Sequence, residues 1–360
     1  MARATQAIID LSAIEQNYRL AKKQAPEADA YAVIKANAYG HGLVDVGLAL
    51  SEIADGLAVA CVDEAEQLRD AGVQSPIMVL EGAYDEEECQ QAASAQLELV
   101  LHQHSQLDWL KNIQSPLKLW IKVDTGMHRL GFQIHEVEAV LNRLSDMAAQ
   151  SGVKHELALM SHFACADQPS EPSNQSQLQA FSSLSKFNLP MSMSNSAAIL
   201  SCSAAHGQRL RPGIMLYGSS PIVDQSAESL CLQPAMTLTS EIIALHDLQA
   251  GESVGYGNTW TAEKDCRIAV VAIGYGDGYP RMAPNGTPIL VKGQRAALAG
   301  RVSMDMITVD VSAVSDVQLG DEVELWGEHL PADEIAQACQ TIAYELFCQV
   351  TPRVPRFYKR

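Results

Sequence analysis

Short apolar runs alternate with amphipathic segments between Tyr31 and Gly218, and this alternation restricts the fold more than any other feature. Eight runs follow one another, and they begin at Tyr31, Leu57, Pro76, Leu97, Leu117, Leu157, Met191 and Arg209. Strands that alternate with helices predict an α/β fold, and this number predicts a TIM-like (β/α)8 barrel. A doubly wound open sheet is the alternative, because a sequence pattern does not show whether the sheet closes.

The expected helices lie between these runs. An amphipathic helix is expected after Asp10, with Asp10 or Ser12 as its cap. Further helices are expected at about 42–54, 64–71, 85–96, 105–113, 134–151 and 174–188, with a short one near Ala197.

Beyond residue 230 the pattern changes to short strands separated by glycine-rich turns, with one helix expected from Ala332 to Cys339. A chain of 360 residues also exceeds the roughly 250 at which a single core stops growing. We therefore predict a barrel domain at 1–231 and a mostly-β domain at 232–360. The first few residues of the chain are expected to pair with the second domain.

Charge and cysteine content exclude several classes of protein. A formal charge of −18 argues against a protein that binds duplex nucleic acid, because such proteins need basic surface. No segment approaches the 18 or so apolar residues of a membrane span, and no targeting signal is expected at the amino terminus, so we predict a cytoplasmic protein. The eight cysteines are scattered and are expected to be buried free thiols. His162 and Cys165 lack a second pair of metal ligands, so no metal site is predicted.

The decapeptide VIKANAYGHG, from Val33 to Gly42, carries the first sign of chemistry. It places Lys35 at the carboxyl end of the first expected barrel strand, where such folds bind their ligands. A partly desolvated lysine there can act as an amine nucleophile or a base. The alternative is a lysine that extends from the strand into water.

Polar residues also follow the later strands. They are Tyr39 with Lys35 after the first strand, Asp124 and Arg129 after the fifth, His162 after the sixth, Asn195 and Ser196 after the seventh, and Arg211, Gly213 and Ile214 after the eighth. Barrels commonly bind phosphate with the loops after strands seven and eight. We therefore expect a phosphate site there, although a helix cap and a simple turn would explain the two segments separately.

A phosphate site facing a reactive lysine suggests pyridoxal 5′-phosphate held as a Schiff base. A lysine aldolase acting on a phosphorylated sugar would use similar parts. Such aldolases usually carry the lysine on a later strand and do not need a second β domain.

The chain resembles the alanine racemase family, whose members are fold type III pyridoxal-phosphate enzymes. The similar segments span nearly the whole chain: VIKANAYGHG at 33–42, KVDTGMHRLGF at 122–132, SHFACAD at 161–167, SNSAA at 194–198, RLRPGIMLYG at 209–218, VGYGNTW at 254–260, AIGYGDGYPR at 272–281, GRVSMDMITVD at 300–310 and TIAYELFCQVTPRVPR at 341–356. The resemblance implies interconversion of L- and D-alanine for peptidoglycan or in alanine breakdown. It also implies a homodimer with shared active sites.

The resemblance further implies a role for each site residue. Lys35 and Tyr256 are the expected catalytic bases on opposite faces of the cofactor, and His162 and Arg211 are expected to support Tyr256. Arg211 would also lie at the pyridine nitrogen. Arg129 is expected to contact the cofactor and the substrate carboxylate, oriented by Lys122, which is carbamylated in some members. The phosphate would be held by Tyr39, Ser196, Gly213, Ile214 and Tyr344. Met304 and Tyr256 would come from the partner subunit, while Tyr344, Tyr275 and Asp305 would narrow the access route, and Asn195 would support the site.

Three alternatives share parts of this pattern. A racemase of broader specificity, for serine or basic amino acids, would use the same machinery in a wider pocket. A fold type III decarboxylase would need a cysteine and acidic substrate-binding residues in a different motif of the second domain. A non-catalytic pyridoxal-phosphate carrier would be a barrel alone.

Overall fold

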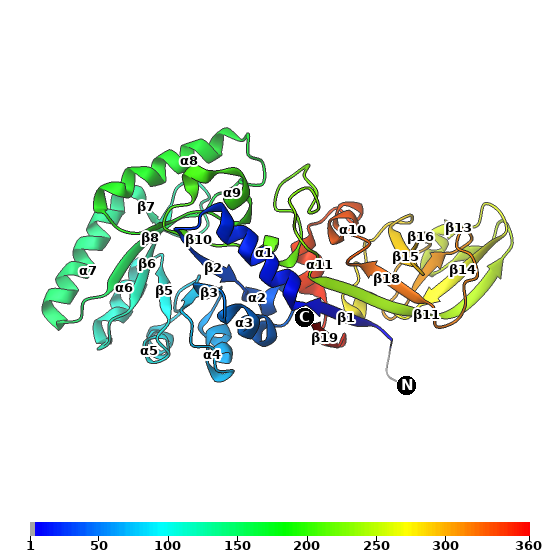
Figure 1. Cartoon of the computed structure of the whole chain (residues 1–360), viewed down its shortest axis with the longest axis horizontal. Coiled ribbons are helices and arrows are strands. Elements are labelled where there is room, and N and C mark those ends of the chain that lie inside the picture. Colours follow the sequence, from blue (N-terminus) through cyan, green and yellow to red (C-terminus); the bar gives the residue numbers. More distant parts are fainter. Residues whose placement is uncertain (1–3) are drawn as a thin grey trace.

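The computed structural model describes residues 4–360, which form a helix-covered barrel and an elongated β-rich part (Figure 1). The amino-terminal segment in which no targeting signal is expected begins outside the described residues, since Arg3 and the residues before it are not described. No helix among residues 4–360 is long and apolar enough to cross a membrane.

Eight parallel strands form the barrel in the order β10, β2, β3, β4, β5, β6, β8 and β9. Their bounds are β2 Asp29–Val33, β3 Gly56–Val59, β4 Ile77–Val79, β5 Glu98–Leu101, β6 Lys118–Asp124, β8 Glu156–Met160, β9 Met191–Ser192 and β10 Arg209–Leu210. Strand β7 (Phe132–Gln133) pairs with β6 outside this path.

Closure of the barrel depends on backbone bonds between the chain around β9 and the chain around β10. The amide of Gln208 donates to the carbonyl of Met191 at 3.0 Å, and the amide of Arg211 donates to that of Ser194 at 3.1 Å. The sheet is therefore closed, which confirms the predicted barrel and excludes the doubly wound open sheet. The eighth apolar run is a strand only at its first two residues, since Ile214–Tyr217 is a 3₁₀ turn.

The barrel helices follow the expected places. They are α1 Leu11–Gln24, α3 Leu43–Ser51, α4 Val62–Asp70, α5 Glu86–Ser94, α6 His104–Trp109, α7 Val137–Ser151, α8 Pro172–Ser182 and α9 Ser196–Ser201. Asp10 caps α1, because its carboxylate accepts from the amide of Ala13 at 2.9 Å. An additional short helix, α2 (Lys35–Tyr39), was not expected from the sequence, and its handedness is inverted.

The second part is built on the long strand β11 (Met236–Leu248), whose two ends pair with different strands. Six antiparallel strands close on one another in the order β14, β17, β16, β15, β18 and β11, because β14 also pairs with β11. The remaining bounds are β12 Ser253–Val254, β13 Trp260–Thr261, β14 Cys266–Val271, β15 Pro288–Val291, β16 Gln294–Leu298, β17 Ile307–Asp310 and β18 Glu322–Trp326. The mostly-β character expected beyond the barrel is confirmed.

The two ends of the chain join this sheet. Strand β1 (Gln6–Asp10) lies between β11 and β19 (Arg356–Lys359). The helix expected near Ala332 is present as α10 (Ala332–Ala338). The expectation of a single helix is wrong, because α11 (Ala343–Gln349) follows it. Seven residues are too few to show a helical period clearly, so α11 depends on packing of Ala343, Leu346 and Phe347 against the core. The exact boundary at 231 and 232 stays a prediction.

The cysteine prediction is correct in one respect and wrong in another. All eight cysteines are free, but Cys89 alone is fully buried, while Cys231 and Cys348 are exposed. Sequence spacing excludes disulfide frameworks, but it does not show which side of a helix faces the core.

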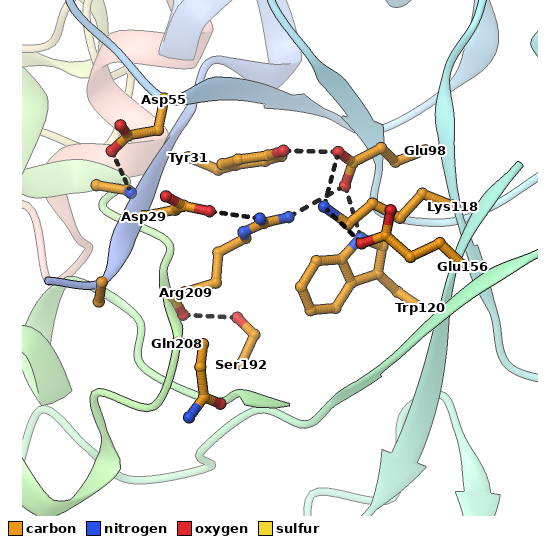
Figure 2. A network of polar contacts seen from close by, with 12 residues as sticks. Asp29, Tyr31, Asp55, Glu98, Lys118, Trp120, Glu156, Ser192, Gln208 and Arg209 are labelled. Carbon is orange, nitrogen blue, oxygen red and sulfur yellow. Dashed lines mark hydrogen bonds and ion pairs between the residues drawn. The ribbon is translucent and has the colours of Figure 1, made fainter. Parts of the chain in front are cut away.

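A polar network fills the amino-terminal end of the barrel (Figure 2). The Arg209 guanidinium lies over the rings of Tyr31 and Trp120, 4.2 and 4.9 Å from their centroids. The carboxylate of Glu98 accepts from Tyr31 Oη at 2.6 Å, from Trp120 Nε1 at 2.7 Å and from Arg209 Nη1 at 3.4 Å. Asp29 accepts from Arg209 Nη2 at 2.6 Å. Because most of these residues begin or lie near the start of a strand, their charges close this end and leave the other end for a ligand.

We predict that Glu98→Ala lowers the free energy of unfolding by about 3 kcal/mol, because it leaves the buried Arg209 charge and two aromatic donors poorly paired. Denaturant unfolding of the full chain measures this. Glu156→Ala is the matched control, since Glu156 contacts the same network through Lys118 but is 65% exposed, and the expected change is below about 1 kcal/mol. Equal effects of the two changes would contradict the assignment.

Candidate active site

A cavity of about 450 Å³ opens at the carboxyl ends of the barrel strands. Eleven of the residues singled out from the sequence line it: Lys35, Tyr39, Lys122, Arg129, His162, Asn195, Ser196, Arg211, Gly213, Ile214 and Tyr344. Residues far apart in the sequence, such as Lys35 and Arg211, meet here because parallel strands all end at the same rim, and Tyr344 is added from α11.

Four other expected site residues lie away from this cavity. Tyr256, Tyr275, Met304 and Asp305 are not among its lining residues, and three of them are exposed large side chains: Tyr256 at 72%, Met304 at 53% and Tyr275 at 38%. Asp305 pairs with Arg353 at 2.9 Å. Within one chain, therefore, the structure does not bring these residues to Lys35.

Arg211 is a buried charge whose position is tightly fixed. Its side chain donates to Ser192 Oγ and, at 2.7 Å, to the carbonyl of Ser161. Burial lowers the pKa of Arg211 to about 10, which still leaves the guanidinium charged at neutral pH. His162 Nδ1 lies 3.4 Å from Arg211 Nη2, and burial with the nearby cations holds the pKa of His162 well below its usual range. The imidazole is therefore neutral, and Nδ1 can accept from Arg211.

Lys122 lies in the same cluster of positive charge. It is only 9% exposed, on β6, and burial together with Arg211, Arg129 and Lys35 holds its pKa well below its usual range. A buried amine with three cationic neighbours loses its proton more readily than an exposed lysine, and the neutral form is the nucleophilic one.

Asp124 shapes the loop that carries Arg129. Its carboxylate accepts from the amides of Gly126 and His128 at 2.9 and 3.0 Å, and it pairs with His128 Nδ1 at 2.8 Å. These bonds lower the pKa of Asp124 and hold the turn that brings Arg129 back over the cavity. Asp124 therefore acts on the loop and is not itself a lining residue of the main cavity.

Ser196, Gly213 and Tyr39 form a small polar cradle in the lining of the cavity. Ser196 Oγ accepts from the amide of Gly213 at 2.8 Å. A Cβ added to Gly213 would lie 2.8 Å from Tyr39 Oη and 3.8 Å from Ser196 Oγ, so only glycine leaves this space open. A hydroxyl, a phenol and backbone amides around an open space suit a phosphate group, and a lysine amine and a buried guanidinium in the same cavity suit an aldehyde-bearing ring. The residues present therefore fit pyridoxal 5′-phosphate.

Sequence reasoning missed several lining residues, including Leu80, Glu81, Met160 and Cys348. Leu80 and Glu81 follow β4, and Met160 ends β8, so the rule that selected Lys35 would have found them. Cys348 lies on α11, the helix that was not expected, and no sequence signal identified it.

Models of two domains, described as "Alanine racemase, N-terminal domain" and "Alanine racemase, C-terminal domain", match residues 9–221 and 235–358. The chain is 50% identical to the biosynthetic alanine racemase of Pseudomonas aeruginosa and 49% identical to an alanine racemase of Stutzerimonas stutzeri, with 98% of each chain covered. It is also similar to the crystal structure of the Pseudomonas aeruginosa biosynthetic enzyme, with a TM-score of 0.96 over 99% of this chain and 100% of that one. For the structure from Acinetobacter baumannii the TM-score is 0.92, at 38% identity, over 99% of this chain and 100% of that one.

Two buried histidines make stability depend on pH. Burial lowers the pKa of His41, which is 0% exposed, to about 3 from an ordinary 6.5, and His162 is shifted in the same direction. Below pH 6.5 the unfolded chain binds protons that the folded chain does not, so stability is full above that pH and is lost as the pH falls toward the folded values.

We therefore predict that the free energy of unfolding falls by about 1.4 kcal/mol per pH unit for His41 between roughly pH 6 and 5, and that His162 adds to the fall. Denaturant titrations at fixed chain concentration measure the slope. His41→Leu should remove the contribution of His41 from the slope of the unfolding free energy against pH. An unchanged slope would contradict the assignment of that contribution to His41.

Proposed function

The chain belongs to the alanine racemase family and is an isomerase that interconverts L- and D-alanine; we propose that Lys35 and Tyr256 move the Cα proton, with pyridoxal 5′-phosphate as cofactor. The observation that supports these roles best is that Lys35 and Arg211 line the same cavity as the Ser196–Gly213 cradle.

The proposed cofactor site has two parts, one for the phosphate and one for the ring. When bound, pyridoxal 5′-phosphate supplies an aldehyde for amines and a ring that withdraws electrons from Cα. Tyr39, Ser196, Gly213, Ile214 and Tyr344 would hold its phosphate. Arg211, held by His162 and the Ser192 hydroxyl, would lie at the ring nitrogen, where its fixed charge disfavours protonation of that nitrogen. Such a ring accepts electrons weakly, which suits an enzyme that only moves a proton.

Racemisation needs a base on each face of Cα. A single group that removes and returns a proton on one side regenerates the starting enantiomer, so a second group must act from the opposite side. Lys35 Nζ would serve one face and Tyr256 Oη the other. Arg129 would bind the substrate carboxylate with its planar guanidinium, and Lys122 beside it would fix its orientation.

The exposure of Tyr256 supports a homodimer with shared sites. Tyr256 begins the Tyr256–Asn258 turn between β12 and β13, in the β-rich part that extends away from the barrel (Figure 1). It does not line the cavity of its own chain, whereas a second copy placed head to tail would bring Tyr256 and Met304 to that cavity. Tyr275 lies beside Met304, since its amide donates to the carbonyl of Ser303 at 3.0 Å, so Tyr275 and Asp305 would arrive with them and narrow the access route.

The physiological role follows from the substrate. We propose that the enzyme supplies D-alanine for peptidoglycan, and the cytoplasmic location stays a prediction. Incubation with L-alanine, L-serine and L-lysine separately, followed by circular dichroism of each amino acid, would distinguish an alanine enzyme from one of broader specificity. Turnover of serine or lysine as fast as alanine would favour the broader racemase.

Tyr256→Phe should lower racemisation by at least about 100-fold, because general base catalysis contributes 10²–10⁴. Lys35 alone should still exchange the Cα hydrogen of one enantiomer with deuterated solvent, which mass spectrometry detects. Borohydride treatment should still label Lys35 with the cofactor in this variant. Full racemisation by Tyr256→Phe would remove Tyr256 as a base.

Mixing Lys35→Ala chains with Tyr256→Phe chains tests the shared site. Each variant alone should be inactive, whereas random re-association gives mixed dimers with one intact site each, or about one quarter of the wild-type activity. Dilution under mild denaturant followed by refolding together provides the exchange. No recovery, in dimers shown to be mixed by mass, would contradict the head-to-tail arrangement.

A further inference from the structure

Lys35 is followed by a turn of inverted handedness. Ala36, Asn37, Ala38 and Tyr39 have φ angles of 53°, 55°, 52° and 50°, so four consecutive residues other than glycine are left-handed. Each residue other than glycine that is left-handed instead of right-handed costs roughly 1–2 kcal/mol of conformational free energy. The turn also carries Lys35 at its start and Tyr39 at its end, and both line the cavity. A conformation this costly persists only where surrounding contacts fix it.

Glu64 fixes the Lys35 end. Its Oε1 accepts from the amide of Ala36, the first peptide after Lys35, at 2.7 Å, and its Oε2 accepts from the amide of Ala60 at 2.8 Å. Ala60 directly follows β3, and Ile34, before Lys35, also bonds to that strand through the carbonyl of Ala58 at 2.8 Å. One half-buried carboxylate on α4 therefore ties the start of the turn to the rim of the barrel.

His41 fixes the Tyr39 end. Its Nδ1 lies 3.1 Å from the carbonyl of Ala38 and 2.9 Å from that of Tyr39, so this nitrogen carries the proton and donates to both. The imidazole packs on the ring of Tyr217, 4.5 Å between centroids, and Tyr217 stacks on Tyr39 at 4.7 Å. The histidine thus holds both the backbone and the ring of Tyr39.

The β-rich part supports the same turn from outside. Arg356 Nε donates to the carbonyl of Gly40 at 2.7 Å, and a Cβ added to Gly40 would lie 2.0 Å from the carbonyl oxygen of Phe347 on α11. Glycine at this position lets α11, which carries Tyr344, approach the turn closely. The contacts from outside the turn come from β3, α4, the Ile214–Tyr217 turn, α11 and the chain end.

We propose that Glu64 and His41 are positioning residues: Glu64 holds Lys35 at its place on the rim, and His41 holds Tyr39 at the phosphate cradle. This inference rests on the proposed roles of Lys35 and Tyr39. Neither Glu64 nor His41 lines the cavity, so both act through the turn.

Glu64→Gln tests the Lys35 end. Glutamine keeps the length and bulk of the side chain but has one acceptor oxygen for two amides, so it separates hydrogen bonding from packing. The full chain, freed of cofactor, is titrated with pyridoxal 5′-phosphate and with pyridoxamine 5′-phosphate, which lacks the aldehyde and cannot join a lysine. For Glu64→Gln we expect pyridoxal 5′-phosphate, the aldehyde, to bind at least tenfold more weakly, and the affinity for pyridoxamine 5′-phosphate, the amine, to change little. We also expect kcat to fall while KM for alanine stays nearly unchanged. Asp63→Ala, the exposed neighbour on α4, is the matched control and should behave as wild type.

His41→Leu tests the Tyr39 end. Leucine keeps apolar bulk but loses both donor contacts, so binding of the aldehyde and of the amine should weaken together, by at least tenfold. His41→Asn, whose amide nitrogen can occupy the place of Nδ1, should restore most of this loss. His155→Leu is the control, because His155 bonds the amide of Leu117 at the opposite end of the barrel.

The outcomes separate this inference from the proposed function. Suppose that Glu64→Gln and His41→Leu lower only Tm, while the Kd of both cofactors and kcat stay within twofold of wild type. The two residues are then merely structural, and the inference is wrong. If both variants weaken the aldehyde and the amine equally, Glu64 does not act on Lys35. If the wild-type chain itself fails to bind pyridoxal 5′-phosphate, the proposed cofactor fails instead.

Discussion

Closure of eight parallel strands is the constraint on which the rest of this molecule depends. Parallel strands of a closed barrel all end at one rim, so side chains from distant parts of the sequence meet there without any local signal that pairs them. The opposite rim is filled by the network around Arg209 and Glu98, whose members begin their strands. The same closure therefore provides an end that is packed for stability and an end that is open to a ligand.

The open end concentrates positive charge. Arg211 is buried and charged, the pKa of the buried Lys122 is held well below its usual range, and His162 is neutral because burial and the neighbouring cations oppose its protonation. An arrangement of this kind is costly in a chain without its ligand, since buried cations need anionic partners. A substrate carboxylate bound by Arg129 would supply such a partner, so part of the electrostatic cost of the site would be recovered when the substrate binds.

The barrel and the β-rich part are interdependent at two scales. Within one chain, β1 joins the sheet of the β-rich part, and Arg356 and α11 contact the turn that follows Lys35. Between chains, Tyr256 and Met304 are available for contact, because they are exposed and do not line their own cavity. The β-rich part therefore stabilises the lysine turn of its own barrel while, in the proposed dimer, it completes the site of the other.

The sequence by itself determined the alternation of strands and helices, and hence the barrel, because burial on both sides of a parallel strand leaves a continuous apolar run that is visible in the chain. It also determined most of the cavity, since one rule about strand ends selected Lys35, His162 and Arg211 together. Only the tertiary structure decided the short helix α11, the left-handed turn after Lys35 and the contacts of Glu64 and His41. Those features depend on packing and hydrogen bonds between segments up to 316 residues apart, such as Gly40 and Arg356, and local propensity opposes a left-handed turn rather than predicting it.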